Sequence, residues 1–343
     1  MNKLSRLLPD SFTLAILAVV VLALVLPCSG ESAHLVGIGS EIAIVLLFFL
    51  QGARLSRPAV LAGILHWRLH LIIFAATFVV FPLLGLALSP LSGTVLTPPL
   101  YIGLVFLCTL PSSVQASVVF TSIAGGNVPA ALCSASISSV IGMVLTPLLV
   151  GLLLQAHGGA SLNGVGSIAL HLLLPFLAGQ VLQSRIDAWM QRHGQAVRLV
   201  DRASVLLMIY GVFSVATLSG MWSRIPASSL LVLAIVDGAL LATMLASTAF
   251  AARRLGLSRE DEIAIVFCGS KKSLVTGIPM ANALFAGASL GLVVLPLMIF
   301  HQLQLMACAT LARRYALGQS AREGAGGIRT EATGSGGCSC RLS

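Results

Sequence analysis

The chain has 343 residues, of which 57% are hydrophobic and only 9% are charged, whereas a soluble domain carries about 25% charged residues. So little polar surface excludes an ordinary soluble domain and predicts a protein whose solvent is lipid. Lys and Arg outnumber Asp and Glu by 20 to 11. They lie in short clusters between apolar runs, without an aromatic-interleaved basic stripe, so no nucleic acid is expected as a partner.

Apolar runs that are long enough to cross a bilayer follow one another along the chain. A spanning helix needs about 20 mostly apolar residues. The first run follows Lys3 and Arg6, and it is interpreted as a spanning helix rather than a signal peptide because further runs follow it. The sequence therefore predicts an all-α integral membrane protein with ten transmembrane helices at residues 11–28, 36–53, 69–89, 100–123, 128–154, 164–183, 203–220, 228–251, 261–285 and 288–312.

The loops between these spans are short, so a single membrane domain is predicted over residues 1–315. The segment 316–343 is rich in Gly, Ser, Thr and Arg and is predicted to be a disordered tail. Its Cys338-Ser-Cys340 motif lacks a second pair of ligands, so no metal site is predicted there.

Positive charges gather on one side of this arrangement. Among the basic residues next to the spans, only Arg224 falls on the other side. The positive-inside rule then places both termini in the cytoplasm and predicts a multi-pass protein of the bacterial cytoplasmic (inner) membrane. The basic residues of the cytoplasmic side are Lys3, Arg6, Arg54, Arg57, Arg68, Arg185, Arg192, Arg198, Arg202, Arg253, Arg254, Arg259 and the arginines of the tail.

The predicted spans divide into two repeats, residues 8–156 and 160–315, with five spans in each. An odd number of spans inverts the second repeat relative to the first. Inverted repeats of this kind are typical of secondary transporters.

The fourth span is interrupted near its middle by Pro111. Proline removes a backbone donor and clashes with the preceding helical turn. Polar side chains follow within ten residues, which predicts a broken helix that lines a functional site. The candidate site residues of this span are Pro111 and the polar residues Ser112, Ser113, Gln115, Ser117 and Thr121.

The ninth span carries two adjacent lysines between residues that weaken a helix, namely Gly269 on one side and Gly277 and Pro279 on the other. A charge at the bilayer centre costs about 2.5–3.5 kcal/mol on insertion scales, so the lysines are expected to face protein or water. Non-helical backbone at this depth must also be buried or line a cavity. The candidate site residues here are Ser270, Lys271, Lys272, Ser273 and Thr276.

Two broken helices, one from each repeat, are expected to meet near the midplane, where their ends can hold an ion or an anionic group. The alternative is a simple kink at Pro111 whose polar neighbours only satisfy backbone groups. Asp237, in the middle of the eighth span, is predicted to pair with Lys271 or Lys272, because buried charges are usually paired. A neutral, hydrogen-bonded Asp237 is the alternative.

Two stretches carry a resemblance to a known family. The run Phe267-Cys-Gly-Ser-Lys-Lys-Ser-Leu274 and the stretch from Leu110 through Gly126-Asn127-Val128-Pro129 resemble the bile acid:sodium symporter family. The likeness is to the branch that is grouped with cation:proton antiporter-type transporters, and it covers about residues 8–316. It implies two inverted five-helix repeats, crossed broken helices four and nine, and alternating access. Helices one, two, six and seven would form a panel against a core, and Asn127 joins the candidate site residues.

The same resemblance implies two sodium ions behind the crossing, but the match to their ligands is partial. Ser117 and Thr121 align with polar positions of the fourth helix, whereas the acidic ligand of the ninth helix falls near Cys268. The next ligand positions fall on Lys271 and Lys272. A lysine ammonium, with three donors, could replace a sodium ion, or the lysine could exchange a proton during the cycle. Na+ and H+ both remain open as coupling ions, and no other cofactor is predicted.

The predicted function is secondary active transport, symporter-like, of a small organic anion, because a positive midplane suits an anionic substrate. Cation/proton antiport through Asp237 and the lysines is one alternative, and a transport-incompetent regulator of the same fold is another. No Walker-type glycine loop, HExxH motif or paired CxxC motif occurs, so no enzyme is expected. The lipid bilayer and the anion are the expected partners, and the sequence sets no oligomeric state.

Overall fold

The computed structural model describes residues 11–54, 66–155, 162–224, 226–285, 287 and 289–334. Within these ranges the fold is all-helical, and strand-like pairing is limited to an isolated bridge between Ser92 and Leu96. A helix satisfies its backbone hydrogen bonds internally, which is what a chain must do in lipid. The predicted all-α class is therefore confirmed for the part of the chain that the structure describes.

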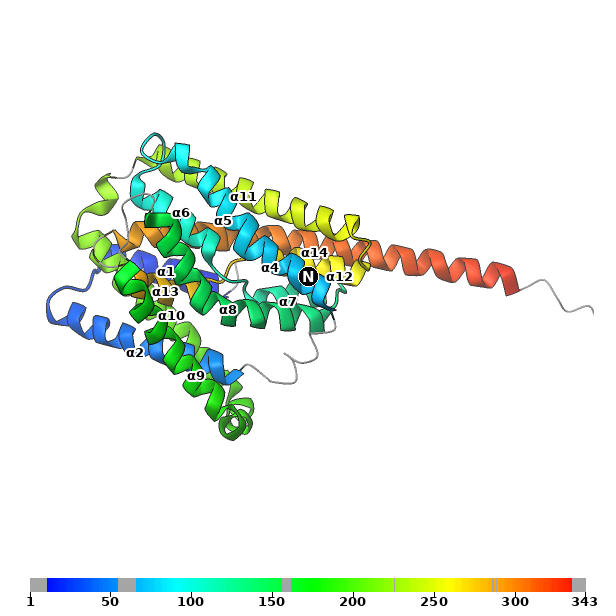
Figure 1. Cartoon of the computed structure of the whole chain (residues 1–343), viewed down its shortest axis with the longest axis horizontal. Coiled ribbons are helices and arrows are strands. Elements are labelled where there is room, and N and C mark those ends of the chain that lie inside the picture. Colours follow the sequence, from blue (N-terminus) through cyan, green and yellow to red (C-terminus); the bar gives the residue numbers. More distant parts are fainter. Residues whose placement is uncertain are drawn as a thin grey trace, which may run out of the picture.

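Figure 1 shows the helices in chain order. They are α1 (Ser11–Val25), α2 (Glu31–Arg54), α4 (Trp67–Ala75), the π-helix η3 (Ala76–Val80), α5 (Phe81–Ala87), the 3-10 turn η4 (Ser89–Leu91), α6 (Pro98–Thr109), α7 (Val114–Ile123), α8 (Val128–Gln155), α9 (Leu162–Arg192), α10 (Gly194–Leu218), the 3-10 turn η5 (Met221–Arg224), α11 (Ala227–Arg254), α12 (Arg259–Gly269), α13 (Leu274–Leu284) and α14 (Leu290–Gly334).

Many of these helices can cross a membrane. In the described residues, 7 are long and apolar enough to do so, or 8 when the bent pair α6 and α7 is counted as one span. Helix α1 adds a shorter apolar segment at Phe12–Val25. The multi-pass membrane class is thus confirmed, whereas the count of ten spans and the inverted repeat stay predictions.

Helix α14 extends past the end of the predicted membrane domain. It runs to Gly334 and projects beyond the other helices (Figure 1). The segment predicted to be a disordered tail is therefore helical as far as the structure describes it. Residues 335–343, with Cys338 and Cys340, lie outside the described residues.

Four helices pack on one another as a group, namely α1, α2, α9 and α10. Helices α2 and α9 touch through their backbones, because a Cβ atom at Gly52 would clash with the carbonyl of Phe176 and one at Gly179 with the carbonyl of Phe49. Arg54 and Asp201 join α2 to α10 by an ion pair of 2.5 Å between Nη2 and Oδ2. This group has the composition that the resemblance implies for a panel of helices one, two, six and seven.

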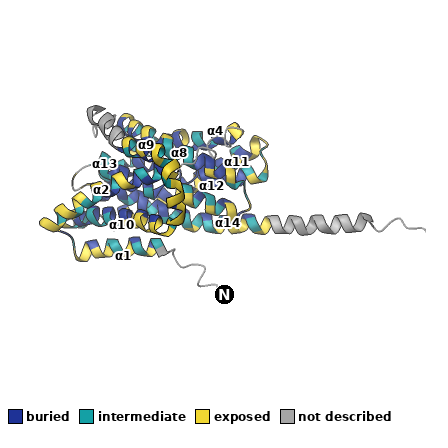
Figure 2. Ribbon diagram, turned by 90° about the horizontal axis from the view of Figure 1, so that it is seen from below, coloured by how far each residue is buried: buried dark blue, intermediate teal, exposed yellow. Residues whose placement is uncertain are grey.

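The remaining helices, from α4 to α8 and from α11 to α14, form a second group that contains both broken helices. In Figure 2 the ribbon is coloured as exposed along the outside of the bundle and as buried where the helices face one another. Many of the exposed side chains are large and apolar, such as Ile42, Leu152 and Ile235, as expected of a surface that faces lipid. The interior holds an unusual pair, since Lys271 and Lys272 are both fully buried.

Candidate functional site

The candidate site lies where two broken helices meet. Helix α6 ends at Thr109 and α7 begins at Val114 after a bend of 61°, while α12 ends at Gly269 and α13 begins at Leu274. Each break falls at the residues for which the sequence predicts it. The breaks touch directly, because the backbone N–H of Ser273 donates to the carbonyl of Pro111 over 3.0 Å.

Serine hydroxyls cover the carboxyl end of the half-helix α12. Ser112 Oγ donates to the carbonyl of Cys268 over 2.7 Å, and Ser117 Oγ donates to that of Phe267 over 3.0 Å. The last carbonyls of a helix have no partner within that helix, so an outside donor must satisfy them. Ser138 on α8 holds the break between α6 and α7, since its Oγ accepts the backbone N–H of Ser112 over 3.1 Å.

Helix α8 comes unusually close to this turn. A Cβ atom at Gly142 would lie 2.6 Å from Cβ of Pro111, which is too close for two carbon atoms. The glycine therefore gives Pro111 the room to break the fourth span against α8.

Lys272 covers the carboxyl end of the other half-helix, α6. Its ammonium donates to the carbonyls of Leu110 at 2.7 Å, Cys108 at 2.8 Å and Thr77 at 3.0 Å. It also lies 4.0 Å from the centre of the Phe81 ring, in the geometry of a cation–π contact. All these contacts are buried.

The carbonyl of Thr77 belongs to the π-helix η3. In this turn the N–H of Phe81 donates to the carbonyl of Ala76, five residues back. Such a wide turn changes the direction of the neighbouring carbonyls and is frequent at functional sites. Here it contributes the third acceptor for the ammonium of Lys272.

The backbone of Lys272 is held as firmly as its side chain. Gln304 on α14 accepts the N–H of Lys272 through Oε1 and donates to its carbonyl through Nε2, both over 2.9 Å. The same Nε2 lies 3.0 Å from Nδ1 of His301. Gln304 is thus a site residue that the predicted set lacks.

Lys271 has a different environment. Its ammonium donates to one carbonyl, that of Ala116 in the first turn of α7, over 2.9 Å. Two aromatic rings cover it, with the ring centres of Phe120 at 3.8 Å and Phe267 at 4.9 Å. The two lysines therefore point to different parts of the crossing.

These contacts imply different chemistry for the two lysines. An ammonium has three N–H donors and no acceptor, and at Lys272 three carbonyls match these donors. A neutral amine there would turn its lone pair toward a carbonyl oxygen. Since the carboxyl end of a helix also carries partial negative charge, the geometry favours a fixed positive charge at Lys272. The single carbonyl at Lys271 imposes no such requirement.

The predicted ion pair between Asp237 and a lysine is wrong. Asp237 is fully buried on α11, and among the described residues neither of its carboxylate oxygens has a hydrogen-bond partner. The alternative of a hydrogen-bonded Asp237 is not found either. The lysines bind backbone carbonyls instead, because the broken helix ends present several unpaired acceptors close to them.

The other predicted residues of the ninth span shape the break itself. Ser270 Oγ donates to the carbonyl of Val266 over 2.5 Å. Ser273 caps α13, since its Oγ accepts the N–H of Thr276 over 3.2 Å and lies 2.9 Å from Oγ1 of Thr276. These side chains satisfy local backbone groups.

The remaining predicted residues of the fourth span lie on α7. Thr121 is buried, and its hydroxyl has no hydrogen-bond partner within the described residues. Ser113 is half-buried and Gln115 is exposed at the start of the helix. Asn127 makes its contacts elsewhere, because its Nδ2 donates to Asp261 Oδ1 over 2.8 Å at the start of α12.

A buried carboxylate, that of Glu262, lies near the start of α12, and the predicted set of site residues does not include it. Glu262 accepts hydrogen bonds from Arg253 at 3.0 Å, Arg259 at 2.8 Å and the hydroxyl of Tyr315 at 3.1 Å. It thereby connects α11, α12 and α14. The spacing of Arg259 and Glu262, three residues apart on a helix, is the signal that could have found part of this cluster.

Comparison with known proteins agrees with this geometry. The sequence matches the SBF-like CPA transporter family over residues 10–317. The chain belongs to this family. The predicted resemblance is thereby confirmed, and since the family consists of transporters, so is the expectation that the protein is not an enzyme.

Relatives of the family extend over nearly the whole chain. An uncharacterized protein of Pseudomonas aeruginosa is 57% identical over 91% of this chain and 94% of its own length. YfeH of Escherichia coli, which is named as a candidate symporter, is 50% identical over the same shares. The rat sodium/bile acid cotransporter 7 is 31% identical over 78% of this chain and 80% of its own length.

Proposed function

We propose that this protein is a secondary active transporter that moves a small organic anion across the membrane by alternating access, with Lys272 as a fixed positive charge at the crossing. The observation that carries the proposal is the triple contact of the Lys272 ammonium with the carbonyls of Thr77, Cys108 and Leu110. Oxygen atoms of this kind are the ligands of hard cations. The lysine therefore holds a position suited to a bound sodium ion.

An anionic substrate follows from the balance of charge. The crossing contains two buried lysines, and neither forms an ion pair among the described residues. The amino end of α7 adds partial positive charge, and the half-buried Ser113 and the exposed Gln115 lie there. Half-helix ends of this kind point at anionic groups of substrates in other transporters.

Protons are the coupling ion that the side chains favour. The sodium-binding acid implied by the resemblance falls near Cys268, and Lys272 occupies carbonyls that a sodium ion would otherwise use. Asp237 is fully buried, and its oxygens have no hydrogen-bond partner in the described part of the chain. Since a charged carboxylate without partners is costly to bury, Asp237 is the candidate proton-binding group.

The arrangement of helices fits alternating access, in which two groups of helices move against each other. The group α1, α2, α9 and α10 would be the panel, and the group with the broken helices would be the core that moves against it. With ten spans in two inverted repeats, both termini would lie in the cytoplasm of a bacterial cell, and the protein would reside in the inner membrane.

Cation/proton antiport is the second candidate, because the unpartnered Asp237 could exchange a proton for a metal cation without any organic anion. The two candidates differ in what they need. A symporter moves protons only with its anion, whereas an antiporter moves them when sodium or potassium is added.

Purified protein in liposomes tests the proposal with labelled taurocholate as the anionic probe. We expect a proton gradient to drive uptake in sodium-free buffer, and Asp237→Asn to abolish the dependence of uptake on that gradient. Uptake that requires a sodium gradient and ignores pH would contradict the coupling. Proton release on addition of sodium or potassium alone, without anion uptake, would establish antiport in place of anion transport.

A further inference from the structure

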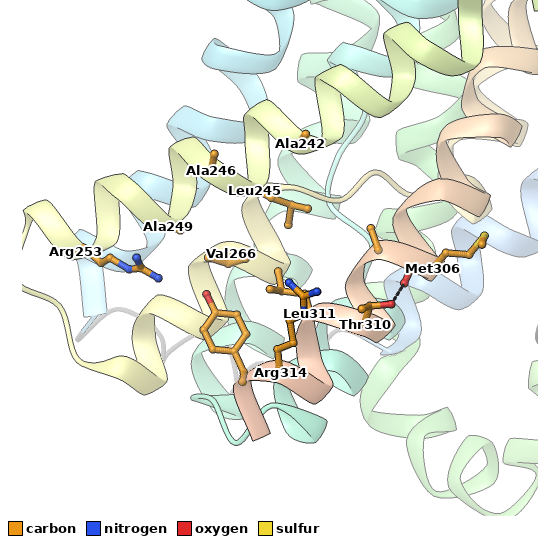
Figure 3. A pocket seen from close by; sticks show the side chains of 12 residues that line it. Ala242, Leu245, Ala246, Ala249, Arg253, Val266, Met306, Thr310, Leu311 and Arg314 are labelled. Atoms are coloured by element: carbon orange, nitrogen blue, oxygen red, sulfur yellow. Dashed lines mark hydrogen bonds between the residues drawn. The ribbon is translucent and has the colours of Figure 1, made fainter. Parts of the chain in front are cut away.

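A groove on the outer side of the core group has no part in the crossing. It lies between α11, α12 and α14 and encloses about 650 Å³. Figure 3 shows three alanines of α11 along one wall, Ala242, Ala246 and Ala249, with Met306 and Thr310 of α14 opposite. These alanines present little bulk, so the space between the two helices stays open although Leu245 of α11 also lines it.

The groove has one charged end. Arg253 on α11 and Arg314 on α14 line it there, and both are exposed. Arg314 forms no ion pair among the described residues, and Arg253 keeps 61% of its side chain exposed although it contacts Glu262. The carboxylate of Glu262 is buried and is already shared with Arg259 and Tyr315. An unneutralised positive charge therefore remains at the mouth of the groove.

The dimensions of the groove match one leaflet of a bilayer. At a rise of about 1.5 Å per residue, the stretch of α11 from Ala242 to Arg253 is roughly 16 Å long. That is about half of a hydrocarbon core of roughly 30 Å. The positive-inside orientation proposed above places the arginines at the cytoplasmic surface, so the apolar part runs from that surface to the midplane.

We propose that this groove binds an anionic glycerophospholipid of the cytoplasmic leaflet, with an acyl chain along the alanines of α11 and the phosphate between Arg253 and Arg314. Apolar length, charge and depth all fit such a lipid, and basic pockets between transmembrane helices bind anionic headgroups in other proteins. Val266 lies at the floor of the groove on α12, the half-helix that leads to the two lysines. A bound lipid would thus hold α11, α12 and α14 together behind the crossing.

Lipid retention measured by native mass spectrometry tests this assignment. Delipidated protein in detergent is mixed with phosphatidylglycerol or with phosphatidylcholine that has the same acyl chains. We expect preferential retention of phosphatidylglycerol. Arg314→Gln should weaken it roughly fivefold, since it removes one of the two arginines placed to contact the phosphate, an exposed ion pair of about 1 kcal/mol. Ala246→Phe, which fills the apolar part, should weaken binding of the same lipid.

Arg313→Gln is the matched control, because Arg313 is an exposed neighbour on α14 that does not line the groove. It should retain the lipid like the wild type. Equal retention of both lipids, or the same loss in the Arg313 and Arg314 variants, would overturn the proposal. A parallel sample is mixed with taurocholate, and retention of taurocholate without retention of phosphatidylglycerol would make the groove a substrate site and would also overturn the proposal. The assay measures no transport, so its failure is separate from a failure of the proposed function.

Discussion

Replacing Lys272 by methionine is expected to abolish anion uptake and to destabilise the folded protein by roughly 3 kcal/mol or more. Three buried carbonyls lose their donor, and each unsatisfied group costs about 1–3 kcal/mol. Removal of a buried charge offsets part of this cost. The carbonyls of Cys108 and Leu110 nevertheless lie at the end of the broken helix α6, where carbonyls have no partner within their own helix. Thermal unfolding in detergent and uptake into liposomes measure the two effects.

Lys271→Met is the matched control for this variant. Lys271 is equally buried, but within the described parts of the chain its ammonium donates to a single carbonyl, that of Ala116. We expect a loss of about 1 kcal/mol, clearly smaller than that of Lys272→Met. If the two variants unfolded at the same temperature, the triple carbonyl contact would have no special importance and the account of Lys272 would be wrong.

Glu262→Ala should have the second large effect, a destabilisation of about 1–3 kcal/mol, because the buried carboxylate accepts three hydrogen bonds while both of its arginine partners are partly exposed to solvent. The change leaves Arg253 and Arg259 without their shared carboxylate and removes the acceptor of the Tyr315 hydroxyl. Because these contacts join α11, α12 and α14, the half-helix α12 would lose its anchor. The midpoint of thermal unfolding measures the loss.

Glu260→Ala provides the comparison for Glu262→Ala. Glu260 lies two residues away in the same turn and is exposed, so its removal should change stability by less than about 0.5 kcal/mol. A similar loss in both variants would show that negative charge in the first turn of α12, rather than the buried cluster, is what matters.

Much of the crossing could be predicted from residue types. Pro111 disrupts helical hydrogen bonding and Gly269 weakens a helix, and the two breaks occur at or directly after these residues, whereas Gly277 and Pro279 lie inside α13. Two lysines in an apolar span had to face protein, and both do. In each case the signal is a residue type that is unfavourable in a continuous membrane-spanning helix.

The partners of these lysines could not be predicted in the same way. They are backbone carbonyls, which every residue possesses, so no residue type marks them. The π-helix at Ala76–Val80 lies in a largely apolar run and contributes the backbone carbonyl of Thr77, which the type of its side chain does not predict. Side-chain charge predicts Asp237 as the partner of a lysine, whereas the broken helix ends supply backbone carbonyls that lie closer to the two ammonium groups.

In the proposed function, Lys272 takes the place of a bound cation at the crossing. Thermal unfolding of the wild type and of Lys272→Ala, each titrated with sodium chloride or with choline chloride, tests it without knowledge of the substrate. We expect the wild type to unfold at the same temperature in sodium chloride and in choline chloride. We expect sodium specifically to stabilise Lys272→Ala, whose vacated carbonyls can bind the ion, by up to about 2.7 kcal/mol at a hundredfold excess over Kd. Saturable stabilisation of the wild type by sodium over choline, with none in the variant, would contradict it.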